Sequence, residues 1–595
     1  MRLRAFLCCG GIILVSLALA ACAKRATPTG GPKDEKPPVM VGSEPENGTT
    51  NFKGNSFIVT FDEYVSLNQL NEKFMVSPPL EKRPNIYLRG KNLHVDFPEQ
   101  LKDSTTYTFY FQDAVRDLNE GNPYNNFQFV FSTGNVLDSL SVTGNILMAS
   151  DLEAGENVLV MLYSNTADSA PRKLIPDYIT LADHRGQFRI DNIKGGKYRI
   201  NGLIDINNNK KYDLSDEIFA FADTIININS WDNYIPAVTT KVDSVPTGLG
   251  MKAVTDTSLN KGQFSLYLFT APPKTRYLKS SDRSESYLLS YILSLPPDSL
   301  NFGFRIDGTD EGDYFLEPNQ AGDTILVWLQ DTTLISKQLI ESIVEYPFTD
   351  STGAVVLKTD TIPMRYIVPR APRISSQQNP YKINNSVVNG TIKPGQEIAV
   401  ISPTPFRTPD TSRIRLYETD GKERKMIAYS VRKDTTSSRR YFISGSFTEE
   451  TRYVIIADSG SFGSIYGETA DSLGIPFTVR PRGSFGNLIL NISNGEGDLV
   501  FQLLDEKEKL LATRRYSGKG NVQFRLLEKG KYKLRVIYDL NGDGKWTTGD
   551  YDLGIQPEPV SYLGKIVDIM VNWDNQESWD VGDRNVKSAD LKLKK

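Results

Sequence analysis

Short runs in which apolar and polar residues alternate, separated by turn-forming residues, occur along nearly the whole of this 595-residue chain. Ser56 to Phe61 and Tyr107 to Phe111 are examples, and Gly, Asn, Asp and Pro cluster between such runs. Alternation with a period of two sends successive side chains to opposite faces of a strand. Turn signals spaced about ten residues apart are typical of β-sandwiches. The pattern predicts an all-β fold made of tandem β-sandwich domains.

An ordered set of motifs occurs twice, which indicates an internal duplication. Each copy has a Phe-Arg-apolar tripeptide, then Gly-Lys-Tyr, then an Asp seven residues after the Tyr, and later Trp-Asp-Asn. The order predicts a two-domain unit used twice, with an extra β-rich stretch between the copies. The copies are Phe188-Arg189-Ile190, Gly196-Lys197-Tyr198, Asp205 and Trp231-Asp232-Asn233, then Phe524-Arg525-Leu526, Gly530-Lys531-Tyr532, Asp539 and Trp573-Asp574-Asn575.

Two domain families resemble parts of this duplication. Pro45-Glu46-Asn47-Gly48, Val76-Ser77-Pro78 and the Asp117 to Asn122 turn make residues 37–134 similar to the bacterial Ig-like domain first described in surface-layer proteins. Residues 138–240 and 484–578 resemble the prealbumin-like fold of carboxypeptidase regulatory domains. The resemblance implies β-sandwiches that act as spacers and docking modules, without the peptidase activity itself.

The first 22 residues read as a lipoprotein signal. Arg2 and Arg4 precede an apolar run from Ile12 to Ala21, and Leu19-Ala20-Ala21-Cys22 resembles the lipobox of bacterial lipoproteins. The resemblance implies cleavage before Cys22, diacylglycerol on its thiol and an N-acyl lipid on its amino group; the alternative is an ordinary signal peptide with a chance Cys. No other stretch approaches the roughly 20 apolar residues that span a bilayer, so the lipid is the expected link to the membrane.

The residues that follow Cys22 favour an outer-membrane address. Ala23 stands where some lipoproteins carry an inner-membrane retention Asp, and Pro28 to Asp34 resembles the start of a lipoprotein type from the Bacteroidota. Asp34-Glu35 lies late for an acidic surface-export signal, which leaves the periplasmic and surface faces open. The expected organisation is a signal peptide at 1–21, a flexible tether at 22–37, an Ig-like domain at 38–135, a prealbumin-like domain at 138–240, a β-rich middle domain at 245–365, a second Ig-like domain at 366–482, a second prealbumin-like domain at 484–580 and a polar tail at 581–595.

Cysteine and histidine usage argues against most catalytic chemistry. Cys8 and Cys9 leave with the signal, so the mature chain has no disulfide, no free thiolate nucleophile and no Cys-ligated metal. His94 and His184 are the only histidines, too few for a multi-histidine zinc site and a poor basis for a Ser-His-Asp triad. A formal net charge of −4 gives no basis for nucleic-acid binding. The sequence therefore predicts a protein that is not an enzyme.

Asp539 to Asp550 has the composition and spacing of a calcium loop. Ca²⁺ takes oxygen ligands from carboxylates, amides and backbone carbonyls. The side chains of Asp539, Asn541 and Asp543, the carbonyl of Lys545 and the carboxylate of Asp550 supply such oxygens at positions one, three, five, seven and twelve. The preceding residues read as a strand, so this is a loop between strands; the alternative is an Asn/Asp/Gly turn that only closes a hairpin.

The corresponding loop of the first copy is a weaker metal candidate. Asp205, Asn207, Asn209 and Asp216 keep oxygens at positions one, three, five and twelve. Lys210 replaces the glycine at position six, and Asn209 removes one charge, so calcium binding is expected to be weaker or lost.

These features predict a non-catalytic, lipid-anchored envelope protein that acts as a structural or interaction scaffold with calcium-stabilised loops. Its expected partners are the membrane, through the anchor, and other envelope proteins. The alternative is a glycan-binding lipoprotein of a polysaccharide-uptake system, which would present exposed aromatic side chains as a flat platform for sugar rings. Trp546 and Trp579 are the aromatic residues expected at the surface, whereas Trp231 and Trp573 are expected to pack.

Overall fold

The computed structural model describes most of the chain. The predicted signal peptide, Cys22, most of the tether and Trp231 lie outside the described residues. The described ranges are 34–228, 263–297, 302–310, 312–368 and 381–587. The chain divides into two compact units, and the two are described separately below. Unit 1 comprises Met1–Ile146, Ala154–Asp213 and Ala220–Leu266, and unit 2 comprises Leu147–Glu153, Leu214–Phe219 and Tyr267–Lys595.

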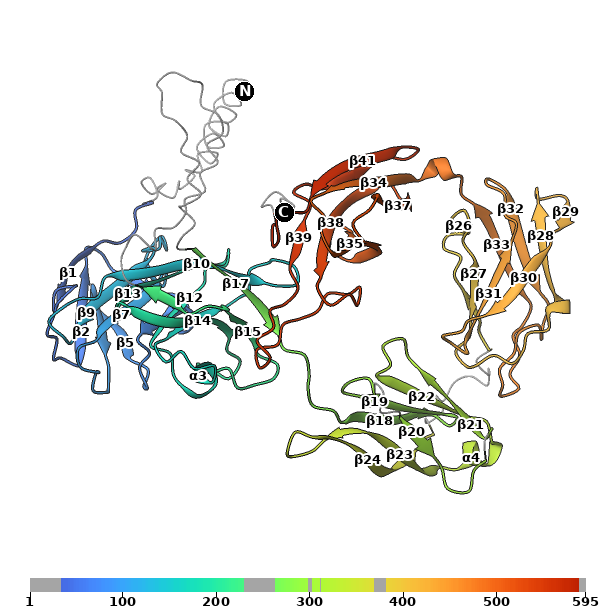
Figure 1. Cartoon of the computed structure of the whole chain (residues 1–595), viewed down its shortest axis with the longest axis horizontal. Coiled ribbons are helices and arrows are strands. Elements are labelled where there is room, and N and C mark those ends of the chain that lie inside the picture. The colour runs from blue at the N-terminus through green and yellow to red at the C-terminus, as the bar shows by residue number, and fades with distance from the viewer. Residues whose placement is uncertain (1–33, 229–262, 298–301, 311, 369–380, 588–595) are drawn as a thin grey trace, which may run out of the picture. The chain divides into compact units, whose positions relative to one another are not determined.

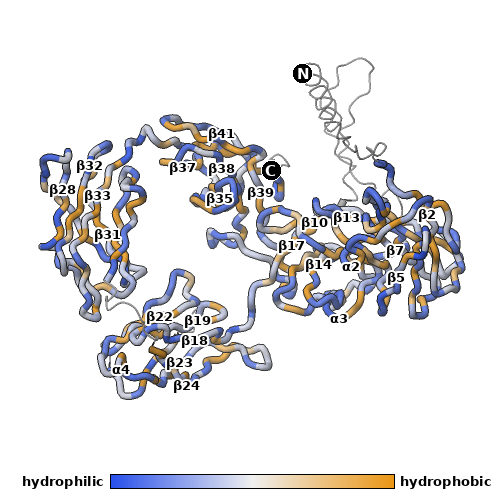
Figure 2. The backbone as a smooth tube through the Cα atoms, turned by 180° about the vertical axis from the view of Figure 1, so that it is seen from behind, coloured by the Kyte–Doolittle hydropathy of each residue, from blue (hydrophilic) through white to orange (hydrophobic). Residues whose placement is uncertain are grey.

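Strands make up nearly all the regular structure (Figure 1), which confirms the predicted all-β fold of tandem β-sandwiches. Hydrophobic residues recur along the strands, and the loops between them are mostly hydrophilic (Figure 2). Within the described ranges, no helix is both long enough and apolar enough to cross a membrane. The helical segments are α2 (Leu70–Lys73), α3 (Ala170–Lys173), α4 (Thr332–Ser336) and the 3-10 turns η3 (Thr411–Arg413) and η4 (Arg482–Ser484).

The N-terminal sandwich, β1 to β9, shows how alternation builds a core. In β2, Phe57, Val59 and Phe61 are buried, whereas the residues between them are only partly covered. Phe57 stacks on Phe129 of β9 with ring centroids 4.0 Å apart, so aromatic side chains fill the core. The sheets are β1-β2-β6-β5, β4-β7-β9 and the pair β3-β8. The strands are β1 (Met40–Glu44), β2 (Ser56–Phe61), β3 (Val65–Leu67), β4 (Met75–Ser77), β5 (Asn85–Arg89), β6 (Asn92–Asp96), β7 (Thr106–Gln112), β8 (Val115–Asp117) and β9 (Phe127–Ser132).

An eight-stranded sheet follows, with the order β12-β11-β14-β15-β17-β10-β13 and β16 paired to β14. Residues 263–270 form its strand β17, whereas the sequence placed them in a separate middle domain beginning at 245. The alternation of residues 263–270 would fit a strand of the middle domain as well as a strand of this sheet. The pairing of Ile218 with Thr270 and of Phe219 with Phe269 shows that the strand belongs to this sheet. The strands are β10 (Leu140–Met148), β11 (Leu159–Tyr163), β12 (Tyr178–Leu181), β13 (Gln187–Ile193), β14 (Gly196–Ile204), β15 (Ile218–Phe221), β16 (Ile226–Ile228) and β17 (Gln263–Thr270).

The middle sandwich, in unit 2, encloses its own apolar core between the sheets β18-β19-β22-β21 and β20-β23-β24. Arg283 of β18 is only 4% exposed and donates to the carbonyls of Ser286 at 2.6 Å and Lys337 at 2.9 Å. Its guanidinium thereby joins the turn between β18 and β19 to the C-terminal end of α4. The strands are β18 (Leu278–Glu285), β19 (Leu288–Leu293), β20 (Gly303–Arg305), β21 (Tyr314–Pro318), β22 (Thr324–Leu329), β23 (Leu339–Thr349) and β24 (Val355–Arg365).

The penultimate sandwich, β25 to β33, is also in unit 2. Its sheets are β25-β27-β31-β30 and β26-β33-β32-β28-β29, and they enclose a core that includes Leu416, Ile443 and Val479. The strands are β25 (Asn384–Asn385), β26 (Thr391–Ile392), β27 (Ile398–Ile401), β28 (Ile414–Thr419), β29 (Arg424–Met426), β30 (Tyr429–Lys433), β31 (Arg440–Gly445), β32 (Arg452–Ala457) and β33 (Leu473–Val479).

A buried carboxylate joins the middle and penultimate sandwiches within unit 2. Glu317 is 8% exposed and accepts hydrogen bonds from the indole of Trp328 and the hydroxyl of Ser437, both at 3.1 Å. Beside it, Tyr287 of the middle sandwich stacks on Tyr466 of the penultimate one with centroids 4.4 Å apart. The contact therefore combines satisfied polar groups with aromatic packing.

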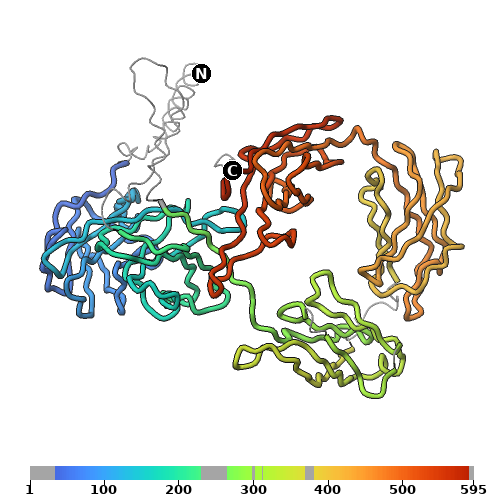
Figure 3. The backbone as a smooth tube through the Cα atoms, viewed as in Figure 1, coloured from blue at the N-terminus to red at the C-terminus, as the bar shows by residue number. Residues whose placement is uncertain are grey.

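The C-terminal sandwich, β34 to β41, completes unit 2, in which the chain finishes one sandwich before it begins the next (Figure 3). Its sheets are β37-β34-β41 and β36-β35-β38-β39, with β40 paired to β38. The strands are β34 (Gly486–Ser493), β35 (Asp498–Leu504), β36 (Leu510–Tyr516), β37 (Asn521–Leu527), β38 (Gly530–Asp539), β39 (Val560–Tyr562), β40 (Val567–Ile569) and β41 (Asp574–Asp580).

Strand β35 is buried on both faces, which explains its continuous apolar run. Phe501 faces the sandwich core, whereas Val500 and Leu504 pack with Leu152 in a second apolar cluster. Leu152 belongs to the Leu147–Glu153 segment of unit 2. A strand covered on both sides loses the polar alternation of a half-exposed strand.

The duplicated Gly-Lys-Tyr motif has the same local structure in both copies. Tyr198 of β14 donates its hydroxyl to the carbonyl of Lys194 at 2.8 Å. Tyr532 of β38 donates to the carbonyl of Glu528, also at 2.8 Å. Each Tyr thus ties the start of its strand to the turn that precedes it.

The residues after β41 do not form a free tail as far as they are described. Val581 is 1% exposed, and the carbonyl of Val586 accepts the N–H of Tyr562 at 2.8 Å. Lys587 is bound to Glu508 at 3.3 Å. The prediction of a polar tail from residue 581 is therefore wrong for 581–587, because polar side chains and backbone here pair with β39 and its neighbours.

Candidate functional site

The two candidate calcium loops leave equivalent strand ends. The first begins at Asp205 directly after β14, and the second begins at Asp539, the last residue of β38. In both loops the residues at positions four and six have left-handed backbone, so the two loops curl in the same way. The φ values are 59° at Asn208, 60° at Lys210, 75° at Gly542 and 77° at Gly544.

Asp539 organises the second loop. Its side chain is buried at the base of the loop, with 7% of the residue exposed. Its Oδ1 accepts the N–H of Gly542 and its Oδ2 accepts that of Gly544, both at 2.7 Å. Each carboxylate oxygen has a further lone pair, so these bonds do not exhaust its capacity to bind a cation.

The side chains at positions three and five of this loop turn toward position nine. The amide of Asn541 donates to the hydroxyl of Thr547 at 2.7 Å, and that hydroxyl lies 3.5 Å from Oδ2 of Asp543. Arg515 donates to the carbonyl of Asp543 at 2.6 Å. The hydroxyl oxygen of Thr547 is a candidate calcium ligand that the sequence analysis did not include.

Glu558 is a second carboxylate at this loop that the sequence analysis missed. It is 4% exposed and accepts the N–H groups of Leu540 at 2.7 Å and Thr547 at 2.9 Å, one on each oxygen. Burial raises the pKa of Glu558, and the charge of Asp539 raises it further against the effect of the hydrogen bonds. Its position between two prolines directly before β39 is the only signal the sequence offers.

Asp550, the predicted ligand at position twelve, forms an ion pair with Lys274. Lys274 donates to Asp550 at 2.8 Å and to Asp552 at 2.9 Å. Although burial opposes it, these hydrogen bonds raise the pKa of Lys274. The structure thus places Asp539, Asn541, Asp543 and Lys545 in one loop and binds Asp550 to a lysine from a distant segment.

The first loop repeats part of the hydrogen bonding of the second, in that its first aspartate also accepts two backbone N–H groups of the loop, at positions five and six. Asp205 accepts the N–H groups of Asn209 at 3.2 Å and Lys210 at 2.7 Å. The amides of Asn207 and Asn209 both donate to Asp213, at 3.1 and 2.7 Å. Asp213, at position nine, is a carboxylate that the sequence analysis missed. Its negative charge compensates for Asn209, which stands at position five where the second loop has an aspartate.

Two features of the first loop differ from a strong calcium loop. Lys210 has a left-handed backbone at position six, which costs a residue with a Cβ about 1–2 kcal/mol. Asp216, the predicted twelfth-position ligand, is exposed. The nearby Glu217 is fully buried and accepts the N–H of Leu214 at 3.1 Å.

Among the residues that the structure describes, no three His, Cys, Asp or Glu side chains are grouped closely enough to share a metal ion. The second loop offers oxygens of the kind that calcium prefers, from two carboxylates, an amide and a hydroxyl, but its carboxylates and Glu558 are not gathered into one group of three in the described residues. Such a set favours a hard cation over zinc or copper.

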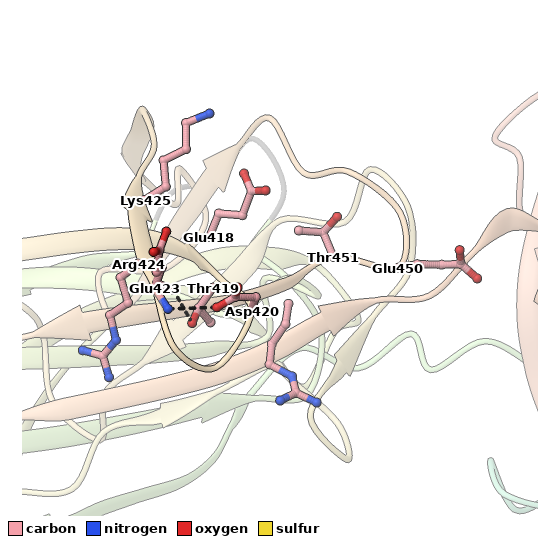
Figure 4. A pocket seen from close by; sticks show the side chains of 9 residues that line it. Glu418, Thr419, Asp420, Glu423, Arg424, Lys425, Glu450 and Thr451 are labelled. Atoms are coloured by element: carbon pink, nitrogen blue, oxygen red, sulfur yellow. Dashed lines mark hydrogen bonds between the residues drawn. The ribbon is translucent and has the colours of Figure 1, made fainter.

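A hollow with charges of both signs lies at the β28–β29 turn (Figure 4). Its lining includes Glu418, Arg424 and Arg452. Asp420 accepts the N–H of Glu423 at 2.8 Å, and the backbone hydrogen bonds from Glu423 and Lys422 lower the pKa of Asp420. This carboxylate therefore stabilises its own turn.

The tryptophans do not lie as the sequence suggested. Trp579 is 6% exposed and packs in the core of the C-terminal sandwich, whereas Trp573 is 66% exposed. Trp546 is half-buried, and its indole donates to the carbonyl of Glu558 at 2.9 Å. In the described ranges, Trp573 is thus the exposed tryptophan, and Trp328 is buried.

Comparison with known proteins gives one family match and several distant structures. No curated protein sequence matches the chain. The S-layer protein rSbsC is 11% identical with a TM-score of 0.14 and covers 89% of this chain and 67% of its own. Native alpha-2-macroglobulin from Escherichia coli is 12% identical with a TM-score of 0.18, and the match covers 50% of this chain and 97% of the macroglobulin chain. The BSP domain of a biofilm associated protein is 9% identical with a TM-score of 0.13, and the match covers 92% of this chain and 99% of that domain. The family that matches is the bacterial Ig-like domain, over residues 34–133, which include the whole N-terminal sandwich.

Proposed function

We propose that this chain is a non-catalytic scaffold of the cell envelope, anchored by lipid at Cys22, whose sandwiches hold other envelope components at fixed positions. The observation that carries the proposal is the buried Glu317 contact between two successive sandwiches. Neighbouring domains are expected to move against one another unless their interface is substantial and well packed. A contact that combines a buried hydrogen-bonded carboxylate with aromatic packing would restrict movement between the two sandwiches, as a spacer of fixed length requires.

The anchor part of the proposal rests on the sequence. Leu19-Ala20-Ala21-Cys22 follows a short apolar run and resembles a lipobox. Diacylglycerol and an N-acyl chain at Cys22 would bury many methylenes, each worth about 0.8 kcal/mol, and more than one chain is needed for stable anchoring. The outer membrane is the favoured location because Ala23 follows the cysteine.

We propose further that calcium stabilises the loop at 539–550, with Glu558 in the role first assigned to Asp550. Asp539 and Glu558 are both buried carboxylates, and their mutual repulsion is a cost that a divalent cation would remove. Asn541, Asp543 and the carbonyl of Lys545 would supply further oxygens. The first loop, with Asp205, Asn207, Asn209 and Asp213, would bind more weakly because Lys210 brings a positive charge to position six.

Crosslinking in the native cells tests the scaffold role. The intact protein is crosslinked, purified through a C-terminal tag and analysed by mass spectrometry for proteins and for polysaccharide. Recovery of a defined set of envelope proteins supports the scaffold. Recovery of polysaccharide with uptake proteins supports the glycan-uptake alternative, and recovery of this protein alone contradicts both.

A further inference from the structure

Strand β24 lies at the border of the middle sandwich and has one open edge. In the order β20-β23-β24 it pairs with β23 on one side (Figure 1), and that pairing runs over eleven residues without a register shift. Among the described residues, β24 is the longest strand at the end of any sheet. Natural sheets usually keep exposed edges short or interrupt them with bulges, as the shifts in the register of the border strand β18 show. A long and regular edge is therefore an exception in this chain.

Every second residue of β24 directs its backbone groups away from β23. The N–H of Tyr366 donates to the carbonyl of Gln338, and the N–H of Asp350 donates to the carbonyl of Ala354, both at 2.9 Å. These bonds at the two ends of the hairpin identify the even-numbered residues of β24 as those bonded to β23, because only alternate residues of an antiparallel strand bond to a given neighbour. The odd-numbered residues therefore point their N–H and C=O groups to the open edge, where no strand of the described ranges pairs with them.

Pro363 marks the end of the donors on this edge. It is an odd-numbered residue of β24, so the N–H that it lacks is one that would point outward. The outward donors that precede it belong to Val355, Leu357, Thr359 and Thr361. Val355 and Leu357 also have exposed side chains, at 44% and 48%. An exposed, partly apolar edge with free donors and acceptors is a template on which another strand can pair.

Two opposite charges flank Thr359 at the centre of this edge. Lys358 and Asp360 form an ion pair at 2.9 Å, and both side chains remain partly exposed. Hydrogen bonds from Tyr346 and Lys358 lower the pKa of Asp360, so its carboxylate is ionised at neutral pH. One positive and one negative charge therefore stand at equal distances in sequence on either side of Thr359.

We infer that this chain forms a two-fold dimer in which β24 pairs antiparallel with β24 of a second copy, centred on Thr359. In that register Lys358 of each copy lies opposite Asp360 of the other, and Leu357 lies opposite Thr361. Opposite charges directly across a strand pair stabilise it, whereas like charges destabilise it. A register shifted by two residues in either direction would place Lys358 opposite Lys358, or Asp360 opposite Asp360. The charges of the strand therefore favour both a second copy as the partner and one register for the pairing.

The same register joins the outward backbone groups of the two copies. Thr359 exchanges N–H to C=O bonds with Thr359, and Leu357 exchanges them with Thr361. The N–H of Val355 meets the carbonyl of Pro363, a residue that can accept but not donate. Pairing of one edge with the identical edge closes after two copies and leaves no site for a third. The inference goes beyond the scaffold role and does not depend on it.

Sedimentation velocity on the purified full-length chain, in density-matched detergent and over a wide range of protein concentrations, tests the inference. The parent chain is expected to dimerise. Thr359→Pro removes the central outward N–H but no bond to β23, so it should weaken dimerisation about tenfold or more. Thr359→Val is the matched control, because it keeps the N–H and should dimerise like the parent. Equal melting temperatures of the two variants would show that the proline variant is folded.

Charge reversal tests the register. Lys358→Asp alone and Asp360→Lys alone each place like charges opposite one another, so each variant should dimerise more weakly than the parent. An equimolar mixture of the two variants should recover the dimer, because every charge then faces its opposite, and misfolding cannot explain a recovery on mixing. A monomeric parent chain overturns the inference, as does a dimer that Thr359→Pro leaves unchanged, single charge variants that dimerise like the parent, or a mixture that dimerises no better than its components.

Discussion

Burial raises the pKa of Glu558, and the charge of Asp539 raises it further. The two residues are 19 positions apart in the sequence, yet the strand end that carries Asp539 and the segment before β39 bring them to one loop. Each carboxylate is also bonded to backbone N–H groups of that loop. A cation bound between the two carboxylates would reduce their mutual repulsion and favour the ionised form of Glu558.

Asp539→Ala with Asp543→Ala should abolish any calcium-dependent rise in melting temperature. Both carboxylates are removed, so a ligand that binds only the folded state loses its site; at a calcium concentration 100 times Kd that binding is worth about 2.7 kcal/mol. Glu558→Gln should reduce the same rise. Differential scanning calorimetry with calcium and with chelator measures it.

Asp550→Asn is the matched control for the calcium response. It breaks the ion pair with Lys274 but leaves the loop carboxylates unchanged, so the calcium-dependent rise should persist. Loss of the rise in this variant, with its retention in Glu558→Gln, would return Asp550 to the role of closing ligand.

Without calcium, Glu558 should make the folded chain less stable as pH rises. A carboxyl whose pKa is higher in the folded state binds its proton more tightly there, so its stabilising effect is present below the unfolded pKa near 4.5 and is lost as pH rises through the folded pKa. Glu558→Gln cannot ionise. Urea unfolding at several pH values should therefore show the variant gaining stability relative to the parent as pH increases.

Calcium supplies the control for this pH effect. A bound divalent cation favours the ionised carboxylate, so saturating calcium should flatten the difference between the parent and Glu558→Gln. A difference that is constant across the pH range, with or without calcium, would contradict the raised pKa.

Glu317→Ala should destabilise unit 2 by about 2 kcal/mol, because it leaves the buried indole N–H of Trp328 and the hydroxyl of Ser437 without their acceptor. Urea unfolding followed by tryptophan fluorescence measures the loss. The exposed Glu341 of β23 provides the control: Glu341→Ala should change stability by less than about 0.5 kcal/mol. Equal effects of the two variants would show that the joint adds no stability.

Arg283→Lys should cost roughly 2 kcal/mol, although the charge is kept. The planar guanidinium reaches the carbonyls of Ser286 and Lys337 together, whereas a single ammonium cannot reproduce that fork. Thermal unfolding of the variant is compared with that of Arg305→Lys, at an exposed position of β20. Similar melting temperatures for the two variants would contradict a structural role for the buried guanidinium.

Cys22→Ser should prevent incorporation of labelled palmitate and release the protein from the membrane fraction. The serine cannot form the thioether that carries the diacylglycerol. Cys8→Ser, within the predicted signal peptide, should leave labelling unchanged. Palmitate label retained by the Cys22→Ser protein would show that the chain is acylated elsewhere or not through a lipobox.

Much of the fold could be predicted because its determinants are local. Alternation in Ser56 to Phe61 becomes the inward and outward faces of β2, and the repeated Gly-Lys-Tyr motif becomes the same hydrogen bond at Tyr198 and Tyr532. Both features depend on residues within a few positions of one another.

The features that sequence reasoning missed depend on distant contacts. Asp550 is bound by Lys274, and no spacing rule connects the two. β17 joins the earlier sheet through its pairing with β15, which its own alternation cannot specify. Asp213 could have been found, because position nine of the loop is a recognised ligand position of calcium loops.

The residues after β41 also cover one edge of the C-terminal sandwich. β39 ends the order of its sheet, and an unpaired outer strand offers a template for another chain to extend. Here the side chain of Asn585 accepts the N–H of Val560 at 3.2 Å, and the carbonyl of Val586 accepts that of Tyr562 at 2.8 Å. By capping those N–H groups, the chain leaves no free backbone donor at Val560 and Tyr562 with which a second copy could extend this edge.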